Sequence, residues 1–419
     1  MKLHYKTQPM IDLIKRLSAK WKEDINLTNE KHQQLVIQQA EFILGKNFDY
    51  SELEKLDVEL ATLKEEFPIG VKLALKLAIS KSFTNAIKID TLISFVFAVY
   101  NEHNRMQKPS GHPNGEDLLS NKINQLNWLC KDNPKLRWQM FVVDDGCPNG
   151  SGDIAHEILQ DNYPNVHVVF LEDGIKNKHP AVHTLNSTNE SRKGASIQYG
   201  MALAAESGSN KNHIIIFTDA DLSTHLGQAG LLVKPIINMD KKVSIASRRE
   251  VNSVVIKKGL RNTRGKLFIY LWKRLLPELN YIIDTQCGFK AFSADHLKKI
   301  IYDADEKKFA FDIELLLKSE LLQKNSIEKI AIAWIDSDAE STTGGNTYLD
   351  MLHSIVKMYR RYIPANPEAD SWANFIKNLG QEDWDHLLDN MPEVIAEANP
   401  SNLNRKLVKV ELLTNIKKP

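Results

Sequence analysis

Short apolar segments alternate with segments of helical spacing through the middle of the chain, and this alternation constrains the fold more than any other feature. It predicts an α/β domain whose mainly parallel sheet is covered by helices on both faces. Ligands of such sheets bind at the carboxyl ends of the strands, so the polar residues that follow each strand are candidates for a functional site. The predicted strands are ISFVFAV (93–99), WQMFVVD (138–144), VHVVFL (166–171), HIIIFTD (213–219) and VSIAS (243–247), and the predicted helices are 117–130, 152–161, 193–206 and 224–238.

The two ends of the chain have helical periodicity. An apolar seam from Leu53 to Phe67 recurs at spacings of three and four residues, which is typical of a helix that packs on another helix. Ser51 and Glu54 match a capping box at its start. Such helices suit docking or the formation of a homo-oligomer. The predicted parts are a helical N-terminal region (1–88), an α/β domain (89–345) and a helical C-terminal region (346–419).

Composition excludes several classes of protein. The 54 Lys and Arg residues against 53 Asp and Glu leave a net charge of +1, so we expect no nucleic-acid partner. Three widely spaced cysteines match neither a metal site nor a disulfide framework and are typical of a reducing compartment. No signal-peptide core or membrane-length apolar run is seen. We expect a cytoplasmic protein. Peripheral membrane contact stays open for the stretch 266–283, whose alternative is a core helix.

Acidic residues stand where two predicted strands end. Asp144 and Asp145 precede the small residues of GCPNGSG, a loop that is either an Asx-Gly turn or a site where carboxylates accept hydrogen bonds from a nucleobase or ribose. Asp219 and Asp221 flank Ala220, so both carboxylates point to one side of an extended segment. Such oxygen ligands suit Mg²⁺ or Mn²⁺ bridging to a diphosphate. Alone, the pair is also compatible with a helix cap or a salt bridge.

Six motifs in order extend this interpretation. The stretches FVFAVYNE, FVVDDGCPNGSGDIA, RKGASIQYGMALA, IIIFTDADLST, ASRRE and DTQCGFKAF together resemble the family-2 inverting glycosyltransferases. They are most similar to the branch of dolichyl-phosphate glucosyltransferases and polyprenyl-phosphate mannosyltransferases. The resemblance covers roughly residues 91–340. It implies a GT-A fold, that is, a Rossmann-like, mainly parallel sheet flanked by helices.

The resemblance also implies a site for a nucleotide-sugar donor, UDP-glucose or GDP-mannose. Asp144 matches the carboxylate that reads the base, and Lys193 lies where a basic residue approaches the diphosphate. The family's P-x-Y-N-E segment is changed at its first position to Ala98. Asp219 and Asp221 match the metal-binding DxD motif, with Asp221 as the direct ligand of Mg²⁺ or Mn²⁺. The implied donor residues are Ala98, Tyr100, Glu102, Asp144, Asp145, Lys193, Asp219, Ala220, Asp221, Gln286 and Gly288.

An acceptor site is implied as well. Arg248, Arg261 and Arg264 match the arginines that bind a phosphorylated acceptor, and guanidinium groups suit phosphate, although a solvated basic helix end has the same pattern. A phosphate acceptor is already anionic and needs no general base. A sugar hydroxyl would need one, for which Asp284 and Asp312 are the candidates. Their alternative roles are helix caps and salt-bridge partners.

The function predicted from these motifs is metal-dependent, inverting transfer of glucose or mannose to a phosphorylated lipid or a saccharide. Two alternatives are a sugar nucleotidyltransferase and a non-catalytic nucleotide-sugar-binding scaffold. The first normally has a Gly-rich basic loop after its first strand, which AVYNEHN lacks, and the intact DxD motif disfavours the second. Insertions at 103–117 and 173–191 are placed to reshape a binding site and leave the acceptor open. The segment 334–348 is either a flap over the cleft or a plain surface loop. His225 is the best-placed candidate for a third metal ligand.

Overall fold

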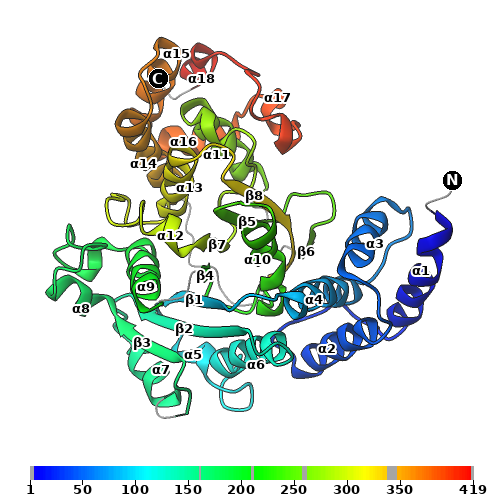
Figure 1. The fold of residues 1–419 in the computed structure, drawn as a ribbon. Helices are drawn as coiled ribbons and strands as arrows, with labels where there is room; N and C mark the ends of the chain where they lie inside the picture. Colours follow the sequence, from blue (N-terminus) through cyan, green and yellow to red (C-terminus); the bar gives the residue numbers. More distant parts are fainter. Residues whose placement is uncertain (1–3, 160–161, 209–211, 257–261, 337–346, 417–419) are drawn as a thin grey trace.

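The computed structural model describes residues 4–159, 162–208, 212–256, 262–336 and 347–416, and a seven-stranded sheet lies at its centre (Figure 1). The strand order is β3-β2-β1-β4-β7-β5-β8. Every neighbouring pair is parallel except the two that involve β7. The strands are β1 (Thr91–Val99), β2 (Leu136–Asp144), β3 (Val166–Phe170), β4 (Asn212–Thr218), β5 (Val243–Ser247), β7 (Phe289–Ser293) and β8 (Ile327–Ala331), with β6 (Val254–Ile256) and β9 (Ala333–Ile335) in a small second sheet.

Helices cover both faces of the sheet, which confirms the predicted GT-A architecture. The α9 helix (Gly194–Ser207) packs on one face, and α6 (Leu118–Cys130) and α10 (Ala229–Asn238) lie on the other (Figure 1). Side chains of β1 alternate between these layers, because Val96 joins the core under α9 whereas Phe95 and Phe97 join the opposite core. All five predicted strands are found. β7 and β8 were not predicted.

The N-terminal helices extend the helical layer on the face of the sheet that α6 and α10 cover. They are α1 (His4–Ser18), α2 (Glu30–Leu44), α3 (Tyr50–Thr62) and α4 (Ile69–Ala86), and α4 shares one continuous core with β1 and α6. The buried Lys76 of α4 pairs with Asp57 of α3 at 2.8 Å. The predicted capping box was wrong, since Asp49 caps α3 and exchanges hydrogen bonds with Glu52 rather than Ser51 with Glu54. Homo-oligomer formation by these helices stays a prediction.

The C-terminal helices pack around α11 (Asn262–Leu275). They are α14 (Thr347–Tyr362), α15 (Pro367–Lys377), α16 (Gln381–Asp389), α17 (Glu393–Ala396) and α18 (Val410–Ile416). Phe268, Tyr270 and Trp272 of α11 are buried, and the Tyr270 hydroxyl donates to the main-chain oxygen of Val408 at 3.0 Å. The stretch 266–283 is therefore a core helix with its following turn. Within the described ranges, no helix is both long and apolar enough to span a membrane.

A glycine sets how closely α9 approaches the sheet. A Cβ atom on Gly200 would lie 2.6 Å from both Val96 Cγ1 and Val143 Cγ2. We predict that Gly200→Ala lowers the free energy of unfolding by about 1–3 kcal/mol, because the overpacked methyl group outweighs the better helix propensity of alanine. Urea denaturation measures this. Gly45→Ala is the control, since its Cβ would meet its nearest atom at 3.5 Å. Equal stability of the two variants would contradict the prediction.

Candidate active site

The DxD turn follows β4 and rests against the loop that leads into β7. Since β7 runs antiparallel to β4, with Phe289 opposite Thr218, the end of β4 and the start of β7 meet at one edge of the sheet. The Asp219 N–H donates to the carbonyl of Gly288 at 3.0 Å. A Cβ on Gly288 would lie 2.2 Å from Asp219 Oδ1, so only glycine fits here without displacing the carboxylate. The DTQCGFK loop and the DxD pair are thus in direct contact.

Lys193 connects two of the acidic strand ends. Its main-chain N–H donates to Asp145 Oδ2 at 2.9 Å, and its ammonium pairs with the Asp219 carboxylate. Its φ of 75° is unusual for a residue other than glycine and marks local backbone strain. Burial disfavours the charged ammonium, but attraction to Asp219 and Asp221 outweighs burial, so the pKa of Lys193 is raised. A cationic side chain therefore lies beside the DxD carboxylates.

Asp221 has fewer compensating partners than Asp219. Its Oδ1 accepts the N–H of Ser223 at 3.0 Å, and it forms no ion pair within the described part of the chain. Desolvation, followed by the negative charge of Asp219, raises the pKa of Asp221. Negative charge at this carboxylate is therefore incompletely compensated by the protein.

The 103–117 insertion brings Arg105 and the carboxylate of Glu116 to this cluster, next to Glu102. Glu102 and Arg105 form an ion pair at 2.7 Å, and Arg105 Nε lies 3.6 Å from Glu116 Oε1. Burial and the nearby charge of Asp221 raise the pKa of Glu116 to about 7, against the attraction of Arg105. Glu116 of this insertion therefore lies near Asp221, and an effect of the insertion on the acceptor site stays a prediction.

The DxD carboxylates fit the divalent cation that the family resemblance implies. Asp219 and Asp221 would hold it, and the incompletely compensated charge of Asp221 favours a cation. No group of three His, Cys, Asp or Glu side chains suited to a metal occurs among the described residues. This agrees with the binding of Mg²⁺ through one or two carboxylates together with substrate phosphates. His225 is buried, its Nδ1 accepts the Gly227 N–H at 3.0 Å, and among the described residues it is in no such group.

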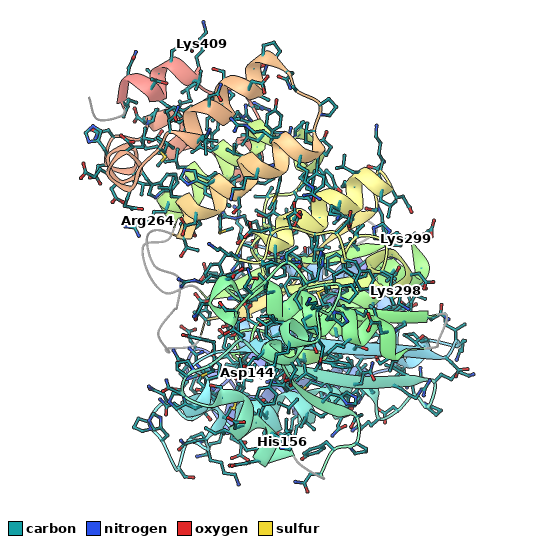
Figure 2. All side chains as sticks on the ribbon, turned by 90° about the vertical axis from the view of Figure 1, so that its left-hand side faces the viewer. Asp144, His156, Arg264, Lys298, Lys299 and Lys409 are labelled. Carbon is teal, nitrogen blue, oxygen red and sulfur yellow. The ribbon has the colours of Figure 1, made fainter. Side chains whose placement is uncertain are left out.

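Asp144 organises the loop after β2. Its Oδ1 accepts the N–H groups of Gly146 at 2.8 Å and Cys147 at 3.0 Å, and its Oδ2 accepts that of Gly152 at 2.8 Å. This is the Asx-Gly turn that the sequence left open. Contact with a base stays a prediction. Figure 2 labels Asp144 in the α/β part of the molecule. Along the neighbouring segment, Ala98 is half-buried, Tyr100 is exposed and Glu102 is buried.

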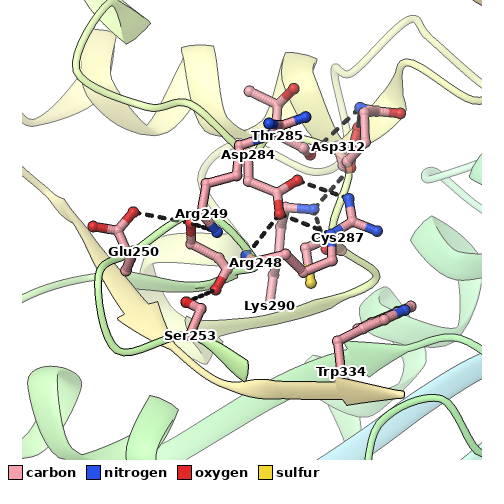
Figure 3. Close-up of polar contacts among 12 residues, drawn as sticks. Arg248, Arg249, Glu250, Ser253, Asp284, Thr285, Cys287, Lys290, Asp312 and Trp334 are labelled. Atoms are coloured by element: carbon pink, nitrogen blue, oxygen red, sulfur yellow. Dashed lines mark hydrogen bonds and ion pairs between the residues drawn. The ribbon is translucent and has the colours of Figure 1, made fainter. Parts of the chain in front are cut away.

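Arg248 and Asp284 form a forked ion pair (Figure 3). Arg248 donates from Nε to Asp284 Oδ2 at 2.8 Å, from Nη2 to Oδ1 at 2.7 Å, and from its main-chain N–H to Oδ2 at 2.8 Å. Although burial opposes ionisation, Arg248 holds the pKa of Asp284 well below its usual range. A carboxylate held in this way is a weak base. The salt-bridge role that the sequence left open for Asp284 is the one the structure adopts.

Asp312 is also in an ion pair. Lys290 Nζ lies 2.8 Å from its Oδ2, and Gln286 Nε2 donates to its Oδ1 at 3.0 Å (Figure 3). Arg264 is exposed in the first turn of α11, and Figure 2 shows it near the C-terminal helices. Arg261 and most of the predicted flap, 337–346, lie outside the described residues. Acceptor binding by the three arginines stays a prediction.

Sequence reasoning missed several charged residues of this site. Lys122 of α6 donates to the main-chain oxygens of Asp219 and Asp221 at 3.0 and 2.9 Å, and burial lowers its pKa to about 8. Its signal was a lysine on the apolar face of the predicted helix 117–130, between Leu119 and Ile123. The missed residues are Arg105, Glu116, Lys122 and Lys290.

The sequence was compared with protein families and with known proteins, and the matches are glycosyltransferases. A family model described as glycosyl transferase family 2 matches residues 114–300. This region resembles the family-2 glycosyltransferase domain. A dolichyl-phosphate beta-glucosyltransferase of Trichomonas vaginalis is 26% identical over 255 residues, which cover 59% of this chain and 67% of the relative. An undecaprenyl-phosphate mannosyltransferase of Micrococcus luteus is 26% identical over 211 residues, covering 49% and 76%.

Solved structures include similar glycosyltransferases. Glucosyl-3-phosphoglycerate synthase of Mycobacterium tuberculosis matches with a TM-score of 0.45 and 15% identity, over 69% of this chain and 85% of that one. The family model and the sequence relatives confirm the predicted family, its branch and the enzyme class of hexosyltransferase. They place the family-2 domain on the part of the chain that carries the DxD turn.

Glu116 provides a test of the charge cluster. The folded protein keeps a proton on Glu116 up to about pH 7, whereas an unfolded chain loses it near pH 4.3, so this group's contribution to stability decreases as the pH rises between these values. We predict that Glu116→Gln raises the free energy of unfolding by about 2–3 kcal/mol at pH 8 and leaves it nearly unchanged at pH 4. Urea denaturation of metal-free protein measures this.

The exposed Glu157 supplies the control, because Glu157→Gln should have no comparable pH-dependent effect. A stability difference between wild type and Glu116→Gln that is the same at both pH values would contradict the prediction.

Proposed function

We propose that the protein is a metal-dependent, inverting hexosyltransferase that moves glucose or mannose from a nucleotide diphosphate sugar to a polyprenyl phosphate. One observation carries the proposal: the DxD carboxylates, the Lys193 ammonium and the Gly288 loop meet where the family-2 domain is expected to bind its donor. The relatives named for transfer to dolichyl phosphate and undecaprenyl phosphate support the acceptor class. Such an acceptor requires contact with a membrane surface.

In the proposed donor site, the acidic residues at the end of each strand have a separate role. Asp219 and Asp221 would hold Mg²⁺ or Mn²⁺, which when bound neutralises charge on the departing nucleoside diphosphate. Lys193 adds fixed positive charge at the same place, in a site already organised before the reaction. The Asp144 loop, rigid through its three main-chain hydrogen bonds, forms the nucleoside side of the cleft. Gly288 allows the sugar-pocket loop to approach the carboxylates.

The ion pairs favour an acceptor that needs no deprotonation. Asp284 is bound by Arg248 and has a lowered pKa, and Asp312 is bound by Lys290. Asp284 is therefore a weak general base in this arrangement, and Asp312 is already paired with a lysine. A phosphate oxygen, already anionic, can attack the anomeric carbon without one, and attack opposite the leaving diphosphate inverts the configuration. A saccharide hydroxyl is the second candidate acceptor and would require one of these ion pairs to open.

Nucleotide binding tests the donor proposal. We predict that UDP or GDP raises the free energy of unfolding only when Mn²⁺ is present, by about 2.7 kcal/mol at a nucleotide concentration 100 times the Kd. Asp221→Ala should abolish this effect because it removes a metal ligand. Thermal denaturation with and without metal measures it, and Asp90→Ala, at an exposed residue before β1, is the control. The absence of stabilisation by any nucleoside diphosphate would overturn the proposal.

Donor and acceptor are then identified by transfer assays. UDP-glucose and GDP-mannose are each incubated with dolichyl phosphate, undecaprenyl phosphate and a free oligosaccharide, and the glycosylated product is quantified. Transfer to a polyprenyl phosphate is expected. Transfer to the oligosaccharide alone would replace the lipid acceptor by the saccharide one.

A further inference from the structure

The α6 helix holds both ends of the DxD segment through two polar side chains on the face that it turns toward the sheet. The fully buried Lys122 donates to the main-chain oxygens of Asp219 at 3.0 Å and Asp221 at 2.9 Å. Three residues later, on the same side of the helix, Gln125 Oε1 accepts the N–H of Leu226 at 2.8 Å. Residues 219–226 are therefore attached to α6 at their beginning and at their end.

The ammonium of Lys122 is directed to carbonyl groups rather than to carboxylates. It lies 5.2 Å from the centre of the Phe97 ring of β1, a distance compatible with a cation–π contact. It forms no ion pair with any residue that the structure describes. A buried ammonium is costly unless its donors are satisfied, and here the two turn carbonyls accept from it. Lys122 thus holds the backbone of the turn and does not occupy the carboxylate oxygens that a cation would need.

We propose that Lys122 is the positioning residue of the DxD turn: by holding the main-chain oxygens of Asp219 and Asp221, it fixes the direction of both carboxylates toward a divalent cation. The inference rests on the proposed function, since that function includes the cation. Groups that orient metal ligands without touching the metal commonly change metal affinity about 10- to 100-fold when they are removed.

A positioning role and a purely electrostatic role of Lys122 predict opposite changes in the affinity for Mn²⁺ when a neutral residue replaces it. A positive charge near a cation site repels the cation, so electrostatics alone predicts that Lys122→Met binds Mn²⁺ more tightly than wild type. Loss of the two hydrogen bonds frees the turn, so positioning predicts weaker binding. The sign of the change therefore distinguishes the two effects.

The buried Lys81 offers a matched control. Like Lys122 it is fully buried, donates to a main-chain oxygen, that of Trp128 at 2.9 Å, and lies near an aromatic ring, 4.5 Å from the centre of Trp128. It differs in pairing with Glu41 at 3.0 Å and with Asp132 at 2.8 Å, and in contacting neither aspartate of the DxD turn. Lys81→Met should therefore lower stability, as Lys122→Met does, without changing the binding of Mn²⁺.

The experiment measures the binding of Mn²⁺ by the full chain in the presence of UDP or GDP, from the paramagnetic resonance signal of free Mn²⁺. We expect Lys122→Met to bind Mn²⁺ about 10- to 100-fold more weakly than wild type, and Lys81→Met to bind as wild type does. Lys122→Arg keeps the charge and the donors but changes their geometry, so a smaller loss is expected. If Lys122→Met shows no cooperative thermal unfolding, Lys122→Arg decides, since weakened binding is expected there too.

The possible failures are distinguishable. Wild type that binds no Mn²⁺ with any nucleoside diphosphate would overturn the proposed function and the inference with it. Wild type that binds Mn²⁺, together with a folded Lys122 variant that binds it equally or more tightly, would overturn the inference alone. An equal loss of affinity in Lys81→Met would also overturn it, because the effect would then follow from general destabilisation.

Discussion

Acidic side chains converge at the carboxyl edge of the sheet, and compensation of their buried charge determines how the surrounding elements are arranged. Removing one partner of a buried ion pair costs about 3–5 kcal/mol, so each carboxylate needs a cation or several hydrogen bonds nearby. The partners come from separate elements: Lys193 precedes α9 and pairs with Asp219, whereas Arg248 follows β5 and pairs with Asp284. These elements are thereby fixed relative to one another. In the proposed function, charges arranged in this way before substrate binds would stabilise a departing diphosphate.

The helical regions at the two ends of the chain pack on opposite sides of the α/β domain, and the N-terminal one is connected to this edge. The α4 helix packs against the other N-terminal helices and against α6. Its Lys81 donates to the main-chain oxygen of Trp128 in α6. α6 in turn holds the DxD turn through Lys122. On the opposite face, α11 is enclosed by the C-terminal helices (Figure 1). The packing of α4 on α6 is therefore linked to the proposed donor site by direct contacts, from Lys81 to α6 and from Lys122 to the DxD turn.

Local patterns predicted the parts of this molecule that depend on local physics. Five strands were found where apolar runs indicated them, because a strand buried on both faces needs a continuous apolar run. The prediction of the capping box was wrong for an equally local reason. Asp49 and Ser51 each precede a glutamate by three residues, so the sequence is compatible with a capping box at either position. β7 was missed because it is short and carries Lys290. The charge of this buried lysine is compensated by Asp312, a contact that the sequence pattern does not indicate.

The sequence by itself determined the α/β architecture, the family resemblance and the segments proposed to bind the donor, because hydrophobic periodicity and the order of motifs are properties of the chain alone. Only the tertiary structure decided which charges meet. Lys122 and the main-chain oxygen of Asp219 are 97 residues apart in the chain, yet they form one hydrogen bond. The aspartates proposed as bases are bound to Arg248 and Lys290 for the same reason. Electrostatic interactions depend on distance in space and on burial, and neither is fixed until the chain has packed.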